Sequence, residues 1–104
     1  MNTAPLVSIV IPAFNPRFFA LALRSALTQS YQYLEIVISD DCPDDGIQQI
    51  VESFAEDARV PLRYLRNAEN AGFPSNLMRG IEAAQGEFIK VLCDDDLLFD
   101  ECIT

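Results

Sequence analysis

The chain has 104 residues, which is the size of one small domain that can bury a core. Half of the residues are hydrophobic, which excludes intrinsic disorder, and the absence of histidine excludes Ser-His and Cys-His catalysis as well as histidine-ligated zinc. The 16 acidic and 7 basic residues give a net charge of −9, which argues against nucleic acid or an anionic membrane as a partner because both attract basic patches.

Short apolar segments of strand length alternate with amphipathic segments of helical period along the chain. The expected strands are residues 6–11, 34–39, 61–66 and 87–92, and the expected helices are residues 17–30, 46–55 and 75–84. The first two strands are apolar on both faces, as in the centre of a covered parallel sheet, whereas the third alternates as an edge strand does. The order β-α-β-α-β-α-β predicts an α/β fold with a doubly wound, mainly parallel sheet.

Polar residues and one glycine mark the expected ends of the helices. Asp44 or Asp45 is expected to cap the second helix and Ser75 the third, because short oxygen-bearing side chains accept hydrogen bonds from the first N–H groups of a helix. Gly86 is expected to stop the third helix.

The three cysteines, Cys42, Cys93 and Cys102, show no CxxC spacing, which indicates reduced thiols in a cytoplasmic protein. The longest apolar run, residues 18–23, is far too short to span a bilayer. The first residues lack the basic region and cleavage site of a signal peptide. We therefore expect a cytoplasmic protein, or one that is peripheral at the inner membrane face.

Nine of the 16 acidic residues lie in two short segments, four in residues 40–45 and five in residues 94–101. Each segment directly follows the carboxyl end of an expected strand. Ligands of open α/β sheets bind outside the carboxyl ends of the strands. The two segments are therefore expected to converge on one site, although they are far apart in the sequence.

Clustered carboxylates repel one another, by about 4 kcal/mol for a pair about 4 Å apart at an effective dielectric constant near 20. A hard divalent cation such as Mg²⁺ or Mn²⁺ reverses this repulsion because it binds carboxylate and phosphate oxygens together. Asp94, Asp95 and Asp96 therefore predict a metal that bridges to a phosphate-bearing ligand. The alternative is that these acids are solvated loop residues or helix caps. Residues 41–52 match a calcium loop only in part, since Pro43 supplies no side-chain oxygen.

Several blocks of the sequence together resemble the family 2 glycosyltransferases, which have the GT-A fold. The blocks are VSIVIPAFNP at residues 7–16, LEIVISDDCPDDG at 34–46 and NAGFPSNLMRGIEAAQGEFIKVLCDDD at 70–96. They occur in the family's order and cover nearly the whole chain. The resemblance implies that residues 1–104 are the nucleotide-sugar-binding part of a GT-A domain, the Rossmann-like half, which ends after the DxD-type acidic motif.

The resemblance also assigns roles to individual residues. The loop after the first strand borders the nucleotide base and ribose, and Asp41 accepts a hydrogen bond from the uracil imide. Gly72 lies in a turn that passes near the nucleotide. Asp94 contacts the ribose or a metal-bound water, and Asp95 holds the metal with Asp96 beside it. The residues implied in the loop after the first strand are Pro12, Ala13, Phe14 and Asn15.

The chain departs from the family pattern at a few positions. Cys93 stands where many members have the first aspartate of the DxD motif, and Ala13 replaces a commoner threonine. Cys42 and Pro43 replace a commoner Gly-Ser pair. On the third expected helix, Asn76 and Arg79 are interpreted as capping or surface residues rather than as ligands.

By this resemblance the protein is an enzyme that transfers a sugar from a nucleotide diphosphate donor, a UDP-sugar, to an acceptor hydroxyl with help from Mn²⁺ or Mg²⁺. The general base and the acceptor site are expected outside this chain, so we expect donor binding without transfer. The alternative is a non-catalytic nucleotide-binding or interaction module of the same fold. The apolar edge of the last expected strand also predicts association into homo-oligomers.

Overall fold

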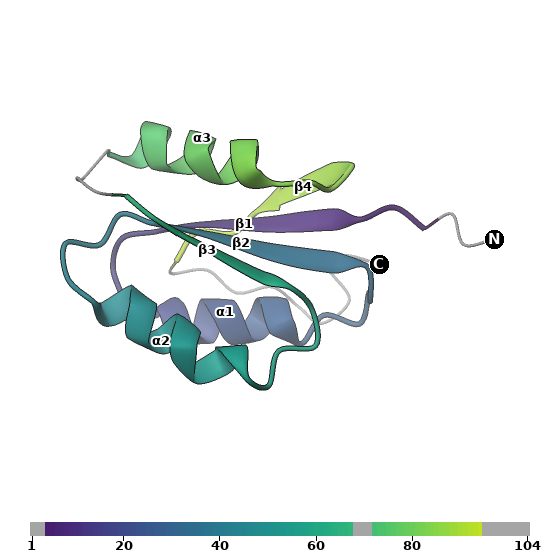
Figure 1. The fold of residues 1–104 in the computed structure, drawn as a ribbon, viewed down its shortest axis with the longest axis horizontal. Helices are drawn as coiled ribbons and strands as arrows, with labels where there is room; N and C mark the ends of the chain where they lie inside the picture. Colours follow the sequence, from purple (N-terminus) through teal and green to yellow (C-terminus); the bar gives the residue numbers. More distant parts are fainter. Residues whose placement is uncertain (1–3, 68–71, 95–104) are drawn as a thin grey trace.

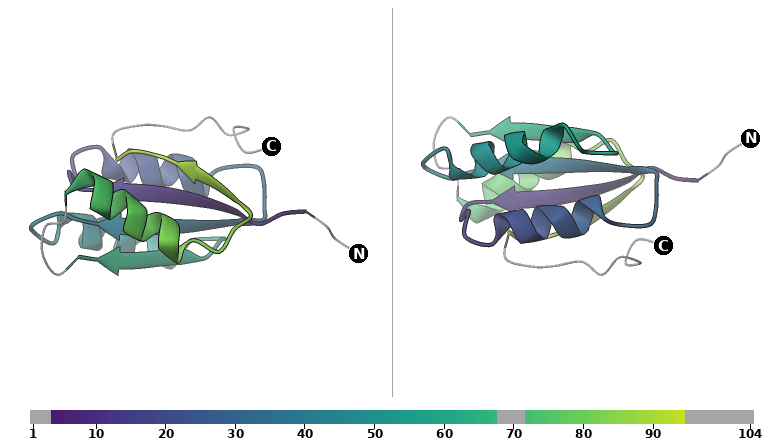
Figure 2. Two further views of the ribbon diagram at one scale, coloured as in Figure 1. Left: turned by 90° about the horizontal axis from the view of Figure 1, so that it is seen from above. Right: turned by 90° about the horizontal axis from the view of Figure 1, so that it is seen from below.

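The computed structural model describes residues 4–67 and 72–94, and within them four parallel strands form one sheet between two layers of helices (Figure 1). Helices α1 and α2 cover one face of the sheet, and α3 lies across the other, as the two turned views show (Figure 2). The predicted doubly wound parallel sheet is therefore confirmed. The elements are β1 (Val7–Ala13), α1 (Phe19–Leu27), β2 (Leu34–Asp40), α2 (Gly46–Ala55), β3 (Leu62–Arg66), α3 (Phe73–Ala83) and β4 (Phe88–Val91).

The strand order β3-β2-β1-β4 places the two most apolar strands in the centre. Every residue of β1 and β2 is buried, and the two strands pair in parallel from Val7 opposite Leu34 to Ala13 opposite Asp40. Strand β3 is half-buried at one edge, which confirms the edge position predicted from its alternating pattern. Strand β4 forms the other edge of the described sheet, and all four of its residues are exposed.

The main apolar core lies between the sheet and helices α1 and α2. Strands β1 and β2 contribute alternate residues such as Ile11 and Ile38, and the helices contribute Phe19, Leu23 and Ile47, all fully buried. This alternation is the two-residue period of a strand packed on one side by amphipathic helices. The two helices and their loops thereby hold the carboxyl ends of the strands in place.

The face of the sheet under α3 is more polar than the sequence indicates. Helix α3 approaches β1 so closely that a Cβ on Gly80 would lie 2.6 Å from a methyl group of Val10. Buried Glu35 accepts hydrogen bonds from the Ser8 hydroxyl at 2.6 Å and from the Gln85 amide at 2.6 Å. The prediction that β1 and β2 are apolar on both faces is therefore wrong for this face, where Ser8 and Glu35 fix the connection from α3 to β4.

The two ends of α3 differ from the expectation. Helix α3 begins at Phe73 rather than at Ser75, because Gly72 adopts a φ of 83° and Pro74 occupies the first turn. It ends at Ala83, before Gly86. Gly86 is required for a different reason, since a Cβ there would lie 2.8 Å from the Leu6 carbonyl oxygen.

The expected bounds of α2 are confirmed, whereas those of α1 are not. Helix α2 begins at Gly46, whose N–H donates to Asp44 Oδ1 at 2.9 Å, so Asp44 rather than Asp45 supplies the side-chain oxygen. Helix α1 spans Phe19–Leu27, shorter at both ends than expected. None of the helices in the described part of the chain is long and apolar enough to cross a membrane.

Candidate functional site

Three segments meet at the carboxyl ends of the strands, on the side of the sheet where β1, β2 and β4 end. The Asp41 N–H donates to the Ala13 carbonyl oxygen at 2.8 Å, which ties the end of β2 to the end of β1. Asp94, after β4, accepts at Oδ2 from the N–H groups of Phe14 and Asn15, both at 2.8 Å. The two acidic segments therefore converge on residues 13–15, as predicted. Asp95 and Asp96 lie outside the described residues.

The Asp41 carboxylate is buried and held in a fixed orientation. Its Oδ1 accepts from Asn67 Nδ2 at 2.8 Å, and its Oδ2 accepts from the Gly72 N–H at 3.0 Å. Each of its two oxygens therefore accepts at least one hydrogen bond from the protein. Asp41 is thus an oriented hydrogen-bond acceptor at the edge of the sheet.

The other predicted site residues lie at the end of β1 and in the loop that follows it. Pro12 and Ala13 are the buried last two residues of β1. Phe14 follows them and is 50% exposed, which leaves an apolar ring at the surface. Asn15 accepts at Oδ1 from the Arg17 N–H at 3.0 Å and thereby shapes the same loop.

Asn76 is the central residue of a buried polar network that the sequence did not reveal. Its side chain is 2% exposed, and its Oδ1 accepts from Ser39 Oγ at 2.7 Å and from Asn67 Nδ2 at 2.9 Å. Its Nδ2 donates to the Ala13 carbonyl oxygen at 3.4 Å. The interpretation of Asn76 as a capping or surface residue is wrong, because the close approach of α3 buries it against β1 and β2. Arg79 is exposed, as interpreted, yet its Nη1 donates to Asn67 Oδ1 at 2.8 Å.

Asp40, the neighbour of Asp41, faces the opposite side of the sheet and has a structural role. It is fully buried, and it accepts from the Cys42 N–H at 2.8 Å and from the Tyr64 hydroxyl. Burial of the phenol and the adjacent Asp40 carboxylate raise the pKa of Tyr64, so this hydroxyl remains a donor at neutral pH. The contact joins the turn after β2 to strand β3.

Asp44 and Asp45, the remaining acids of residues 40–45, also form hydrogen bonds within the protein. Arg66 donates from Nη1 to Asp45 Oδ1 at 2.7 Å and from Nη2 to the Asp44 carbonyl oxygen at 2.9 Å. The Gly46 N–H lowers the pKa of Asp44. Among the four aspartates of residues 40–45, only Asp41 is therefore directed at the α3 side of the site. The role predicted for the whole segment can apply only to Asp41.

Cys42 is expected to react slowly with alkylating agents. Its side chain is buried, and desolvation raises the pKa of its thiol, so less of the reactive thiolate is present at a given pH. We predict that iodoacetamide at pH 8 modifies Cys42 about tenfold more slowly than the half-buried Cys93, as followed by mass spectrometry of peptides. Equal rates at the two cysteines would show that the turn after β2 opens readily.

The described residues contain no preformed metal site. Among residues 4–67 and 72–94, no three Asp, Glu or Cys side chains come together in a way that could hold a metal ion. The carboxylate of Asp94 is of the type that a hard cation binds, and its anchoring by the loop N–H groups fixes its position. The donor set of the acidic motif therefore fits Mg²⁺ or Mn²⁺ in its chemistry.

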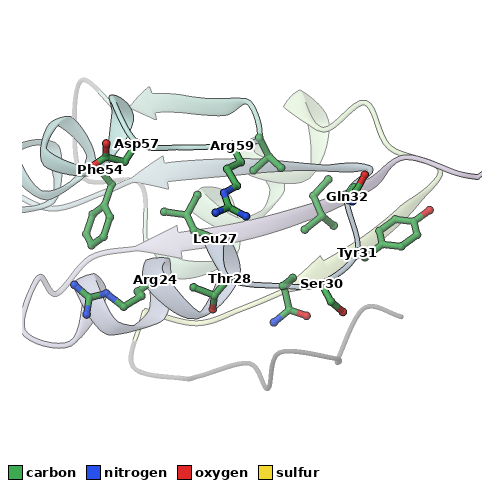
Figure 3. Close-up of a pocket in the computed structure, with 12 residues that line it drawn as sticks. Arg24, Leu27, Thr28, Ser30, Tyr31, Gln32, Phe54, Asp57 and Arg59 are labelled. Carbon is green, nitrogen blue, oxygen red and sulfur yellow. The ribbon is translucent and has the colours of Figure 1, made fainter.

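Figure 3 shows a cavity, whose volume is about 830 Å³. Leu34, the first residue of β2, is among the residues that line it, so the cavity lies at the opposite end of this strand from Asp41. It is lined by side chains from α1, from α2 and from the segments that follow them, among them Arg24, Phe54 and Arg59. Helices α1 and α2 both end at this cavity, and the carbonyl groups at helix ends carry partial negative charge. These partial charges and the Asp57 carboxylate oppose the positive charges of Arg24 and Arg59 in the cavity.

Comparisons with known proteins place the chain in a family. A family model described as Glycosyl transferase family 2 matches residues 8–104. The putative teichuronic acid biosynthesis glycosyltransferase TuaG of Bacillus subtilis (strain 168) is 35% identical over 97 residues, covering 91% of this chain and 38% of TuaG. The chain therefore belongs to glycosyl transferase family 2, as its motifs indicate.

Solved structures confirm the Rossmann-like part of the GT-A fold. S. aureus TarS 1-349 in complex with UDP matches with a TM-score of 0.83 at 27% identity, covering 92% of this chain and 29% of that chain. The mannosyltransferase PcManGT from Pyrobaculum calidifontis in complex with GDP-Man and Mn²⁺ matches with a TM-score of 0.82 at 26% identity, covering 89% and 28%. This chain thus spans less than two-fifths of TuaG and less than a third of the other two chains.

Proposed function

We propose that this chain is the donor-binding part of a glycosyltransferase that transfers a sugar from a nucleotide diphosphate to an acceptor hydroxyl. The observation that carries the proposal is the oriented Asp41 carboxylate beside the loop of residues 13–15, which Asp94 holds from the other side. The similarity to proteins solved with UDP and with GDP-Man supports a nucleotide-sugar donor. The remainder of the reaction, including the acceptor and the general base, is assigned to protein outside these residues.

Donor recognition follows from the chemistry of the residues around Asp41. Uracil and guanine each present a ring N–H, and an ionised carboxylate is the matching acceptor. The exposed ring of Phe14 offers an apolar surface to the base. Within residues 4–67 and 72–94, no atom lies within 4 Å of the point where a Gly72 Cβ would be. Pro12, Ala13 and Asn15 are assigned to the nucleotide-binding surface beside Phe14.

We assign the divalent metal to the acidic motif that begins with Asp94. Asp95, with Asp96 as its neighbour in the sequence, would hold Mn²⁺ or Mg²⁺. Asp94, which anchors the loop of residues 13–15, would contact the ribose or a metal-bound water. When bound, the metal stabilises the negative charge that grows on the leaving diphosphate. The complex of PcManGT with Mn²⁺ supports this assignment.

Two further assignments concern the protein as a whole. We place it in the cytoplasm, or peripherally at the inner membrane face, which agrees with the lack of a disulfide spacing among its three cysteines. The exposed edge strand β4, with Phe88 and Ile89 at its surface, is a candidate contact between copies of this chain. Light scattering at micromolar concentration tests this contact, and a monomer contradicts it.

Calorimetric titration with UDP and GDP, with and without Mn²⁺, tests the proposed function. We expect Mn²⁺ to strengthen the binding of one of the two nucleotides about tenfold or more, since a shared cation contributes charge-assisted contacts to the diphosphate. Asp95→Ala is expected to remove this gain without preventing folding. Binding that ignores the metal would favour the alternative, a non-catalytic nucleotide-binding module of the same fold.

A further inference from the structure

The side-chain amide of Asn67 connects Asp41 to helix α3. One Nδ2 hydrogen is directed to Asp41 Oδ1 at 2.8 Å, and the other to Asn76 Oδ1 at 2.9 Å. Its Oδ1 accepts from Arg79 Nη1 at 2.8 Å. The backbone N–H of Asn67 also donates to the Asp40 carbonyl oxygen at 3.0 Å, which fixes the residue beside the end of β2.

The orientation of this amide follows from the chemistry of its partners. A guanidinium can only donate, so the Asn67 oxygen must face Arg79, and an ionised carboxylate can only accept, so the nitrogen must face Asp41. The second Nδ2 hydrogen then requires an acceptor, and Asn76 presents its oxygen. Ser39 Oγ donates to the same oxygen at 2.7 Å, which fixes the Asn76 amide in turn.

We propose that Asn67 is a positioning residue for nucleotide recognition, which orients the Asp41 carboxylate toward a ring N–H of the base. This proposal rests on the proposed function. The Asn67 amide and the Gly72 N–H bind different oxygens of Asp41 and set the plane of the carboxylate. The fixed acceptor selects uracil and guanine, which carry a ring N–H, over cytosine and adenine, which lack one on the corresponding ring nitrogen in neutral form.

A double-mutant cycle tests this role by NMR titration with UDP and GDP in the presence of Mg²⁺. Asn67→Ala is expected to weaken binding of the preferred nucleotide about five- to tenfold in the otherwise unchanged chain. In a chain that already carries Asp41→Asn, the same substitution is expected to cause less than about a twofold loss, because no carboxylate remains to be positioned. Similar losses in both backgrounds would indicate a general structural effect and would overturn the proposal.

Substitutions of two exposed arginines separate the positioning role from a general loss of folding. Arg79→Met removes the donor that orients the Asn67 oxygen, and Arg24→Met removes an exposed arginine of α1 at the far end of the sheet. We expect Arg79→Met to weaken nucleotide binding about two- to fivefold and Arg24→Met to leave it unchanged. If the two variants bind the nucleotide equally well, Arg79 does not orient the Asn67 amide for nucleotide binding, and this part of the proposal is wrong. If the unchanged chain binds neither UDP nor GDP, the proposed function itself is contradicted, which distinguishes that failure from the failure of the positioning role.

Discussion

Replacing Asp41 with asparagine is expected to weaken the binding of UDP or GDP about 10- to 100-fold while the chain stays folded. A hydrogen bond to a charged group contributes about 1.5–3 kcal/mol, which corresponds to this range of affinity. The new amide has one acceptor oxygen where the carboxylate has two, yet the Asn67 amide, the Gly72 N–H and the nucleotide base all present donors. At least one of the three donors then faces an NH₂ group, and the bound base is the partner that can leave.

The control for this substitution must also remove one negative charge, because a less acidic chain attracts an anionic nucleotide more strongly. Asp57→Asn makes the same change at the exposed far end of the sheet, beside the cavity at the ends of α1 and α2. Calorimetry of the two variants at one salt concentration separates the specific effect from the general one. If both variants bind the nucleotide equally well, Asp41 does not recognise the base.

The fold and the convergence of the acidic segments could be predicted from the sequence because they depend on repeated patterns. The apolar runs of β1 and β2 repeat over seven residues each, and the alternation of strands with amphipathic segments leaves few topologies. A parallel sheet then brings all carboxyl ends to one edge, so Asp41 and Asp94 are expected beside residues 13–15 without any knowledge of contacts.

The supporting network could not be predicted in the same way. Asn67 and Asn76 are isolated amides, and an isolated asparagine carries no spacing signal that separates a buried link from a surface residue. The start of α3 was missed because Pro74 fits the first turn of a helix as well as a loop, and only the positive φ of Gly72 marks the boundary. Buried Glu35 lies in an apolar run, and its hydrogen-bond partners come from β1 and from the segment between α3 and β4.

One available signal separates the roles of Asp40 and Asp41. Side chains alternate between the two faces of a strand, so Asp40 continues the face of Ile36 and Ile38, whereas Asp41 continues the face of Ser39. The structure follows this rule, since Asp40 binds Tyr64 and Asp41 binds residues on the α3 side. Extending the two-residue period past the end of β2 indicates one carboxylate on each face of the sheet.

Replacing Asp40 with alanine is therefore expected to lower stability rather than affinity. The substitution leaves the Cys42 N–H and the hydroxyl of half-buried Tyr64 without their acceptor. We expect this loss to lower the free energy of unfolding by about 2–4 kcal/mol. Urea unfolding at pH 7 measures this loss. Nucleotide affinity, measured at a temperature where the variant is folded, is expected to change less than about threefold, and a selective loss of affinity would assign Asp40 to the nucleotide site.

The pH dependence of unfolding also tests the hydrogen bond from the Tyr64 hydroxyl to Asp40. Its pKa in the folded chain lies above the ordinary value of 10.0, first because of burial and second because of the Asp40 carboxylate. The stability that this shift contributes is fully present below about pH 10, where the phenol is protonated in both states, and it is lost as the pH rises further. We expect Tyr64→Phe and Asp40→Ala to lose less stability than the unchanged chain between pH 9 and 11. Tyr33→Phe, which changes an exposed ring, is expected to behave like the unchanged chain. If Tyr64→Phe loses as much stability as the unchanged chain between pH 9 and 11, groups other than Tyr64 cause that loss.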